Sequence, residues 1–391
     1  MESKETVTPA PSRRSGQIGL SGIREIFEKA QKIPDVIRLE FGEPDFDTPD
    51  NIKDAAIRAI KSGKTKYTSS AGLPELRRAI SDKFSKDNGV EYDPYKEVVV
   101  TAGATSALNV SFLATVDVGD EVLIPDPGWA TYSHAVQIVG ATPLPYPLRE
   151  STGYAFEKEI VQELITPRTK AILIDSPSNP TGSIFSRANV NEISDFAIQN
   201  NLFVISDEVY EKFLYTDSAE QLSIASLPEM KERTVTVNAF SKTYAMTGWR
   251  LGYAASSEPI ATAMTKINAS QGSCVSSVAQ YAGIEALTGP QDSVMQMISA
   301  FARRRDVMVK GLNQLPGFSC PLPQGAFYAF PNVSGTGLNS YSLAMKVVEQ
   351  AHVAVVPGSA FGSKGESHLR LAYANSIENI ETALDRIRKA L

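Results

Sequence analysis

Residues with reactive side chains follow directly after four short apolar runs of the chain. A lysine, an acidic residue, an amide and a set of small residues stand in these places, and two arginines follow further along. The four apolar runs are EVVVT (97–101), AILID (171–175), LFVIS (202–206) and TVTVN (234–238). The segments that follow them are residues 102–106, 176–182, 207–210 and 239–242, respectively. Together they suggest a phosphate cradle, an acid, an amine and two cations at one site.

Each of these residues also has an ordinary interpretation. Gly103, Ala104 and Thr105 open a predicted helix with small residues that let backbone N–H groups approach an anion, but small turns before helices are common. Asp207 suits a helix N-cap equally well. Lys242 suits a solvated side chain and Arg250 a surface salt bridge.

Arg370 alternates with apolar residues in the run HLRLAY (368–373), which predicts a strand. Its side chain either points outward to water or enters a cleft, where its guanidinium forms a fork for a carboxylate.

The elements that carry these residues alternate between strands and helices from about residue 90 to 255. Val190, Ile193, Phe196 and Ala197 follow one strand at helical spacing, and a helix is expected from about Ser106. The pattern predicts an α/β fold with a mostly parallel, doubly wound sheet covered on both faces. Since ligands bind outside the carboxyl ends of such strands, the four strand ends are expected to meet at one pocket.

The last hundred residues predict a smaller α+β domain. Short strands are expected over Gly325 to Phe330, Val353 to Val356 and His368 to Tyr373, followed by a terminal helix with Asn375 as its N-cap. We predict a flexible segment over 1–15, a large domain over 46–285 and the small domain over 286–391.

Composition excludes several classes of protein. The 391 residues carry 38 basic and 44 acidic side chains, a net charge of −6 that argues against nucleic acid as a partner. The sequence contains no run of 18 apolar residues, so no membrane span is predicted. The polar N-terminal residues lack the apolar core of a signal peptide. Two cysteines and three histidines, without metal-ligand spacing, predict no disulfide framework and no metal site, which fits the cytoplasm.

Nearly the whole chain resembles the class I aminotransferases, which are pyridoxal-phosphate enzymes of fold type I, and in particular the aspartate and aromatic aminotransferases. The most specific segment is SKTYAMTGWRLG (241–252). The others are NPTG (179–182), SDEVY (206–210), LEFGEPDFDTP (39–49) and LRLAY (369–373). The resemblance implies a large cofactor-binding domain, and a small domain against which an N-terminal arm over residues 16–45 packs.

The resemblance also implies a role for each matching residue. Lys242 would hold pyridoxal 5'-phosphate as a Schiff base and move the α-proton, and Asp207 would keep the pyridine nitrogen protonated. The implied cofactor contacts are Tyr210 and Asn179 at the ring oxygen, Trp129 on the ring face, and Gly103, Ala104, Thr105, Ser241 and Arg250 at the phosphate. Arg370, Gly42, Trp129 and Asn179 would bind the substrate, with Arg370 on its α-carboxylate.

Tyr67 matches a tyrosine that reaches the phosphate of the neighbouring subunit in the family, which implies a homodimer with shared sites. Without the resemblance, Tyr67 would be an ordinary turn residue. The chain has no charge at Thr105, where one similar aspartate-specific branch has a lysine, so either another residue binds a side-chain carboxylate or aromatic and aliphatic donors are better. Ala239 also replaces a frequent serine.

The predicted reaction is transfer of an amino group from an L-amino acid, aspartate or aromatic, to a 2-oxo acid such as 2-oxoglutarate. A second hypothesis keeps the cofactor but changes the reaction to that of a carbon–sulfur lyase or a ring-forming synthase. A regulator that senses an amino acid is disfavoured because no DNA-binding domain precedes residue 16. A Rossmann dehydrogenase is disfavoured because no GxGxxG motif opens a helix near an early strand.

Overall fold

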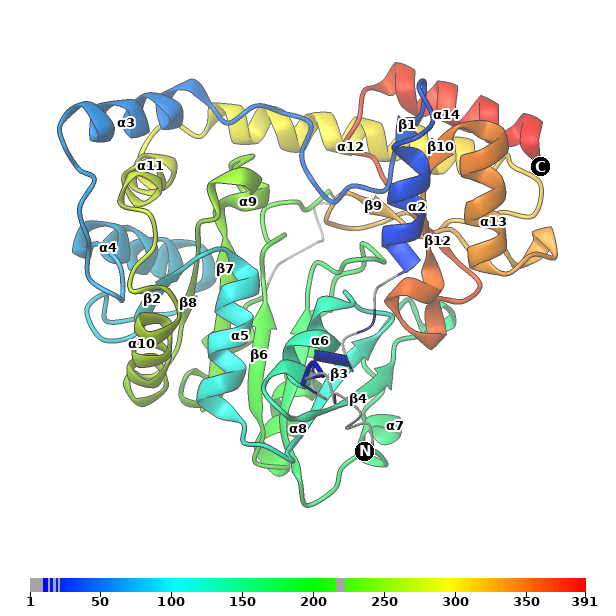
Figure 1. Ribbon diagram of the computed structural model, residues 1–391. Helices are drawn as coiled ribbons and strands as arrows, with labels where there is room; N and C mark the ends of the chain where they lie inside the picture. Colours follow the sequence, from blue (N-terminus) through cyan, green and yellow to red (C-terminus); the bar gives the residue numbers. More distant parts are fainter. Residues whose placement is uncertain (1–9, 13–14, 17–18, 20–21, 216–221) are drawn as a thin grey trace, which may run out of the picture.

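A seven-stranded sheet is the centre of the computed structural model, which describes residues 10–12, 15–16, 19, 22–215 and 222–391 (Figure 1). The strand order is β2-β8-β7-β6-β5-β3-β4, and only β8 runs antiparallel to its neighbours. The predicted α/β fold with a mostly parallel sheet is therefore confirmed. The strands are β2 (Val98–Thr101), β3 (Glu121–Asp126), β4 (Thr142–Pro147), β5 (Thr169–Asp175), β6 (Phe203–Asp207), β7 (Thr234–Ala239) and β8 (Gly252–Ala255).

Helices cover both faces of this sheet because successive strand residues point to opposite sides. On β5, Ala171 and Leu173 pack against one group of helices, and Ile172 and Ile174 pack on the other face. The first group is α5 (Ala104–Thr115), α6 (Thr131–Ile138) and α10 (Glu258–Gly272). On the other face α8 (Arg187–Gln199) shares a core with β5, and α4 (Pro74–Lys83) and α11 (Ser277–Thr288) share a core with β2 and β8.

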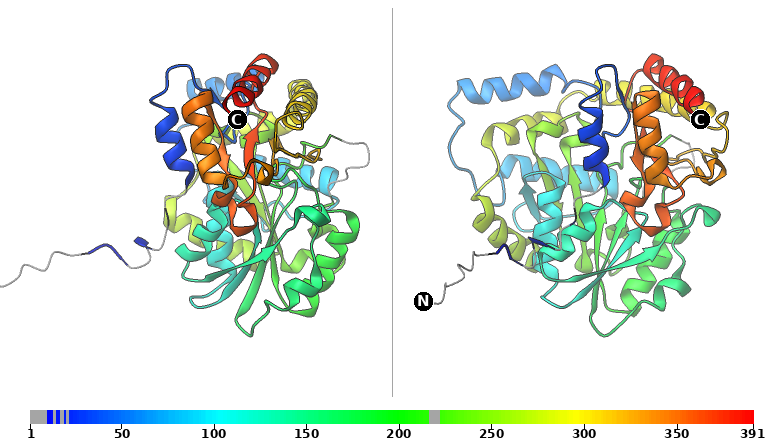
Figure 2. Two further views of the ribbon diagram at one scale, coloured as in Figure 1. Left: turned by 90° about the vertical axis from the view of Figure 1, so that its right-hand side faces the viewer. Right: turned by 45° about the vertical axis from the view of Figure 1, so that its right-hand side comes forward.

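A smaller group of elements lies beside the carboxyl ends of the parallel strands (Figures 1 and 2). Strand β1 (Ile37–Arg38) pairs in parallel with β10 (Val353–Ala354), and β11 (Val356–Pro357), β12 (Leu369–Ala372) and β9 (Tyr328–Ala329) form an antiparallel sheet. Around them lie α2 (Gly22–Ala30), α12 (Asp292–Leu312), α13 (Ser340–Lys346) and α14 (Ile377–Ala390).

The N-terminal and C-terminal segments share one apolar core. Leu39 is buried in the same cluster as Leu312, Leu371 and Ile380. This shared core supports the proposal that residues 16–45 pack with a small domain over 286–391, beside a large domain over 46–285. The predicted flexible segment 1–15 lies largely outside the described residues.

Several predicted elements differ from the structure in their bounds, and the strand predicted over Val353 to Val356 forms two strands, β10 and β11. The N-cap of α14 is Ser376, whose hydroxyl accepts from the N–H of Asn379, so the prediction of Asn375 is wrong. Asn375 lies one residue earlier and accepts from the Ser376 N–H. The strand predicted over 325–330 forms a ladder only at Tyr328–Ala329. Gly325 makes an isolated bridge with Leu214, and the N–H of Ala326 donates to the carbonyl oxygen of Phe213.

The remaining elements are short or connect these layers. They are α3 (Asp50–Lys61), α7 (Lys158–Gln162), α9 (Phe240–Thr243), and the π-helical turns η1 (Phe84–Asn88) and η7 (Val347–Ala351). The 3-10 turns are η2 (Glu150–Thr152), η3 (Ile224–Ser226), η4 (Lys231–Arg233), η5 (Thr247–Trp249), η6 (Ser334–Thr336), η8 (Gly358–Phe361) and η9 (Ser363–Gly365). None of the helices in the described ranges combines the length and hydrophobicity needed to cross a bilayer.

Leu173→Ala tests the two-faced packing of the sheet. Leu173 is 0% exposed, so we expect the substitution to lower the free energy of unfolding by about 2–5 kcal/mol, whereas Leu113→Ala, on a side chain that is 41% exposed, should change it by less than about 0.5 kcal/mol. Urea unfolding of both variants measures this difference. Equal shifts of the two midpoints would contradict the described core.

Candidate active site

A cavity of about 360 Å³ lies where the smaller group of elements meets the carboxyl ends of the parallel strands. Residues that follow β2, β5, β6 and β7 line it, as predicted from the strand ends, together with residues from the N-terminal segment, β9 and β12. The lining residues are Glu40, Phe41, Gly42, Ala104, Thr105, Trp129, Tyr132, Asn179, Asp207, Val209, Tyr210, Ala239, Ser241, Lys242, Arg250, Tyr328 and Arg370.

Lys242 presents its amine at this cavity from α9, the single helical turn that follows β7. Its Nζ donates to the carbonyl oxygen of Gly42 and lies 6.0 Å from the ring centroid of Tyr210. Burial lowers the pKa of Lys242 to about 8, and the positive charges of Arg370 and Arg250 act in the same direction. At a pKa of about 8, roughly a tenth of this amine is neutral and nucleophilic at pH 7, far more than for an ordinary lysine.

Asp207 ends β6 and is buried at the cavity. Its carboxylate accepts from the hydroxyl of Tyr132 at 2.9 Å and from the N–H of Val209 at 3.3 Å. Turns and not a helix follow it directly, at residues 209–212, so the N-cap interpretation is wrong. Burial raises the pKa of Asp207, and it raises that of the neighbouring Asp175 as well, so a cationic partner would stabilise the ionised form of this pair.

The start of α5 forms one end of the cavity. Gly103 is its N-cap with φ +81°, and no side chain caps the helix. The Arg250 side chain lies over this glycine, so a Cβ there would stand 2.6 Å from a guanidinium nitrogen. Arg250 makes no ion pair within the described ranges, which removes the salt-bridge interpretation. Free helix N–H groups, a guanidinium and the Ser241 hydroxyl make this end suitable for a phosphate.

Arg370 is buried and faces the cavity rather than water. One terminal nitrogen donates to the side-chain oxygen of Asn179 at 3.0 Å, and the other donates to the carbonyl oxygen of Glu40. Its Cζ lies 4.6 Å from the ring centroid of Tyr328 and 4.9 Å from that of Phe361. This placement holds a desolvated guanidinium ready for an incoming carboxylate.

Tyrosines enclose the space between these charges. The hydroxyls of Tyr210 and Tyr328 lie 2.7 Å apart, and a Cβ on Gly42 would overlap the Tyr328 hydroxyl. Only glycine at position 42 therefore lets the N-terminal segment approach the site this closely. Trp129 lines the cavity edge-on to Tyr132, with ring centroids 5.6 Å apart.

Two predicted site residues do not line the cavity of this chain. Gly103 stands directly behind it, and Tyr67 is 88% exposed and away from the lining. Six lining residues were not predicted as site residues: Glu40, Phe41, Tyr132, Val209, Ala239 and Tyr328. For four of them the available signal was a position within two residues of Gly42, Asp207 or Ser241, and for Tyr132 it was the position one helical turn after Trp129. Tyr328 had no such signal.

Similarity to characterised proteins extends over the whole fold. Residues 34–387 match the family described as Aminotransferase class I and II. The chain is 48% identical to a probable aspartate/prephenate aminotransferase of Aquifex aeolicus, over 91% of each protein. It is 40% identical to aromatic-amino-acid aminotransferase 2 of Thermococcus litoralis, over 98% of each.

A solved structure shares the same architecture. The aspartate aminotransferase from Rhizobium meliloti superposes with a TM-score of 0.93 at 39% identity, covering 98% of this chain and 99% of the other. The family match covers most of the sequence, and the identities to full-length relatives are high. The chain therefore belongs to the class I and II aminotransferases.

Proposed function

We propose that this chain, a pyridoxal-phosphate-dependent aminotransferase, moves the amino group of an aromatic L-amino acid or of aspartate to a 2-oxo acid such as 2-oxoglutarate. The observation that carries the proposal is the meeting of Lys242, Asp207 and Arg370 at one cavity. An amine, a buried carboxylate and a buried guanidinium are the groups that an amino acid and a pyridine cofactor need there.

The residues of the cavity fit the cofactor. Asp207 is a desolvated carboxylate whose pKa the charge of Lys242 lowers. A protonated pyridine nitrogen would be a further cation that stabilises the ionised form of this carboxylate. The uncapped start of α5 with Ser241 and Arg250 fits a phosphate dianion. Trp129 supplies a large flat side chain for the ring.

When bound, the cofactor supplies an electron sink for the bonds of the substrate α-carbon. Lys242 would hold it covalently and, once released, carry the α-proton on Nζ. Asp207 would keep the ring nitrogen protonated, and Tyr210 with Asn179 would hold the ring oxygen. Arg370 would fix the substrate carboxylate in a bidentate contact, with Gly42 leaving room beside it.

A homodimer and a cytoplasmic location are part of the proposal. Tyr67 is 88% exposed in one chain, which suits the role of reaching a neighbouring subunit's phosphate, and Ile57 and Ile60 are exposed nearby on α3. Sedimentation of the purified protein measures the assembly, and a monomer would contradict the proposed homodimer.

The cysteines support the proposed cytoplasmic location. Both of them, Cys274 and Cys320, are free thiols, as in a reducing compartment.

Lys242→Ala is the direct test of the proposed function. Without the amine, we expect loss of covalent cofactor attachment and a fall in kcat of at least about 10²–10⁴-fold, because the general base is removed. The visible spectrum and the turnover with an amino donor measure the two effects. Lys231→Ala, which changes a lysine paired with Glu97 outside the cavity, is the control. Full activity of Lys242→Ala would contradict the assignment.

The lowered pKa of Lys242 predicts how cofactor capture depends on pH. The amine is unreactive while protonated, so the rate at which apoenzyme captures pyridoxal phosphate should rise with pH and level off above about 8. An exposed lysine in a peptide should continue to gain reactivity up to about pH 10.4. Stopped-flow absorbance over a pH series compares the two. The same pH dependence for both would show that burial does not act on this amine.

The charges of the cavity predict the preferred donor. Among its described lining residues the cations are Lys242, Arg250 and Arg370, and each has a proposed partner on the cofactor or the α-carboxylate. With Trp129 placed against the cofactor ring, the aromatic side chains of Phe41 and Tyr328 are left for the donor side chain. We therefore expect kcat/KM for phenylalanine or tyrosine to exceed that for aspartate by about tenfold or more. A donor panel at fixed 2-oxoglutarate measures this, and a preference for aspartate would contradict it.

A further inference from the structure

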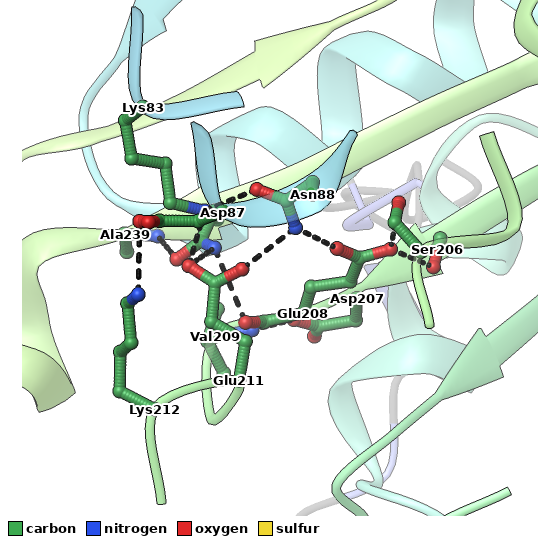
Figure 3. A network of polar contacts seen from close by, with 12 residues as sticks. Lys83, Asp87, Asn88, Ser206, Asp207, Glu208, Val209, Glu211, Lys212 and Ala239 are labelled. Atoms are coloured by element: carbon green, nitrogen blue, oxygen red, sulfur yellow. Dashed lines mark hydrogen bonds and ion pairs between the residues drawn. The ribbon is translucent and has the colours of Figure 1, made fainter. Parts of the chain in front are cut away.

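A buried polar network lies behind the loop that carries Asp207 and Tyr210 (Figure 3). Asp207 and Tyr210 line the cavity, whereas Glu208 and Glu211 of the same loop lie in this network and are only 1% and 6% exposed. The loop is formed by turns and not by a helix. Its position therefore depends on side-chain contacts more than that of a regular element does.

Asn88 joins the two buried carboxylates. Its Nδ2 donates to Glu208 Oε2 at 3.1 Å and to Glu211 Oε2 at 2.9 Å, and its Oδ1 accepts from Lys83 Nζ at 2.8 Å. Asn88 ends η1, on an element far from the loop in sequence (Figure 3). Both polar ends of this one amide are thus used to hold Glu208, Glu211 and Lys83 together.

The outer contacts of the network end on segments that form the cavity wall. Glu208 Oε1 accepts from the hydroxyls of Ser206 at 2.9 Å and Ser223 at 2.8 Å. Asn238 donates to Glu211 at 2.8 Å and to the carbonyl oxygen of Glu208 at 3.2 Å, and it accepts from the N–H of Ala239 at 2.7 Å. A shift of the two glutamates would therefore move both the Asp207–Tyr210 loop and Ala239.

Charge balance makes Asn88 important in this network. The two buried carboxylates share one buried cation, since Lys83 forms an ion pair with Glu211, and Lys212 pairs with Asp87 at the outer edge. Burial raises the pKa of Glu208 to about 7, and the charge of Glu211 raises it too. Tyr92, Tyr244 and Tyr253 also lie within reach of the charges of these glutamates, and burial raises the pKa of each tyrosine, so all three stay neutral.

We propose that Asn88 is a positioning residue, which shares one amide between Glu208 and Glu211 and so fixes the loop that presents Asp207 and Tyr210 to the cofactor. The inference rests on the proposed roles of Asp207 and Tyr210. Asn88 itself touches neither the cavity nor the substrate. Its removal leaves two like charges facing each other in a buried site, and the loop then moves to relieve them.

Two substitutions at this position separate positioning from general stability. Asn88→Ala removes the donor at every pH. Asn88→Asp puts a third carboxylate between the glutamates, which repels them when ionised but can donate one hydrogen bond when protonated. The control is Lys212→Ala, which removes the outer ion pair and leaves the Asn88 amide in place.

The readouts are the dissociation constant of pyridoxal phosphate, from fluorescence titration of each apoenzyme, and the Tm of each apoenzyme. Values are compared with the wild type at the same pH. We expect Asn88→Asp to bind about 10–100-fold more weakly at pH 8 and to recover most of this loss at pH 6. Asn88→Ala should bind more weakly at both pH values but recover part of its loss at pH 6, because protonation of Glu208 removes the like charge without restoring the amide donor. Lys212→Ala should bind as the wild type does.

Cofactor binding like that of the wild type in both Asn88 variants, with or without a lower Tm, would overturn the positioning role. Weaker binding by Asn88→Asp with no recovery at pH 6 would overturn it too. If Asn88→Ala does not fold, the pH dependence of Asn88→Asp decides the outcome. A wild-type protein that fails to bind pyridoxal phosphate would instead overturn the proposed function, so the two failures are distinguishable.

Discussion

The active cavity depends on keeping charged groups out of water. Lys242, Asp207 and Arg370 are ionisable groups whose pKa values burial shifts toward their neutral forms. A desolvated charge is costly unless hydrogen bonds or opposite charges compensate for it. The chain supplies part of this compensation through Tyr132, Asn179 and the carbonyl oxygen of Glu40. The rest is expected from the cofactor ring, its phosphate and the substrate carboxylate, so the same burial that destabilises the empty site favours binding.

The fold provides this burial by bringing distant segments to one sheet edge. The parallel strands place Asn179, Asp207 and Lys242 side by side, and both faces of the sheet are already covered by helices. The pairing of β1 with β10 and of β12 with β9 then closes the cavity with Gly42, Tyr328 and Arg370. Behind the wall, Asn88 donates to the two glutamates of the loop that supplies Asp207, Val209 and Tyr210 to the cavity.

Much of this arrangement could be predicted from the sequence, because residues after parallel strands must gather at one edge. Lys242, Asp207 and Asn179 were placed by that rule. The direction of Arg370 could not be predicted, since an alternating strand does not reveal which of its faces meets the cavity. Tyr328 reaches the site only through tertiary packing. Asn375 and Ser376 are both good N-caps, so the sequence alone could not separate them.

The most direct measurement is to fix the bound cofactor chemically and find where it is attached. The purified protein is incubated with pyridoxal phosphate, reduced with borohydride, digested, and mapped by mass spectrometry. We predict a stable adduct on the peptide that contains Lys242 and no comparable adduct on any other lysine. An adduct located mainly on a different lysine, or an unmodified Lys242 peptide after full loading, would contradict the assignment of this amine.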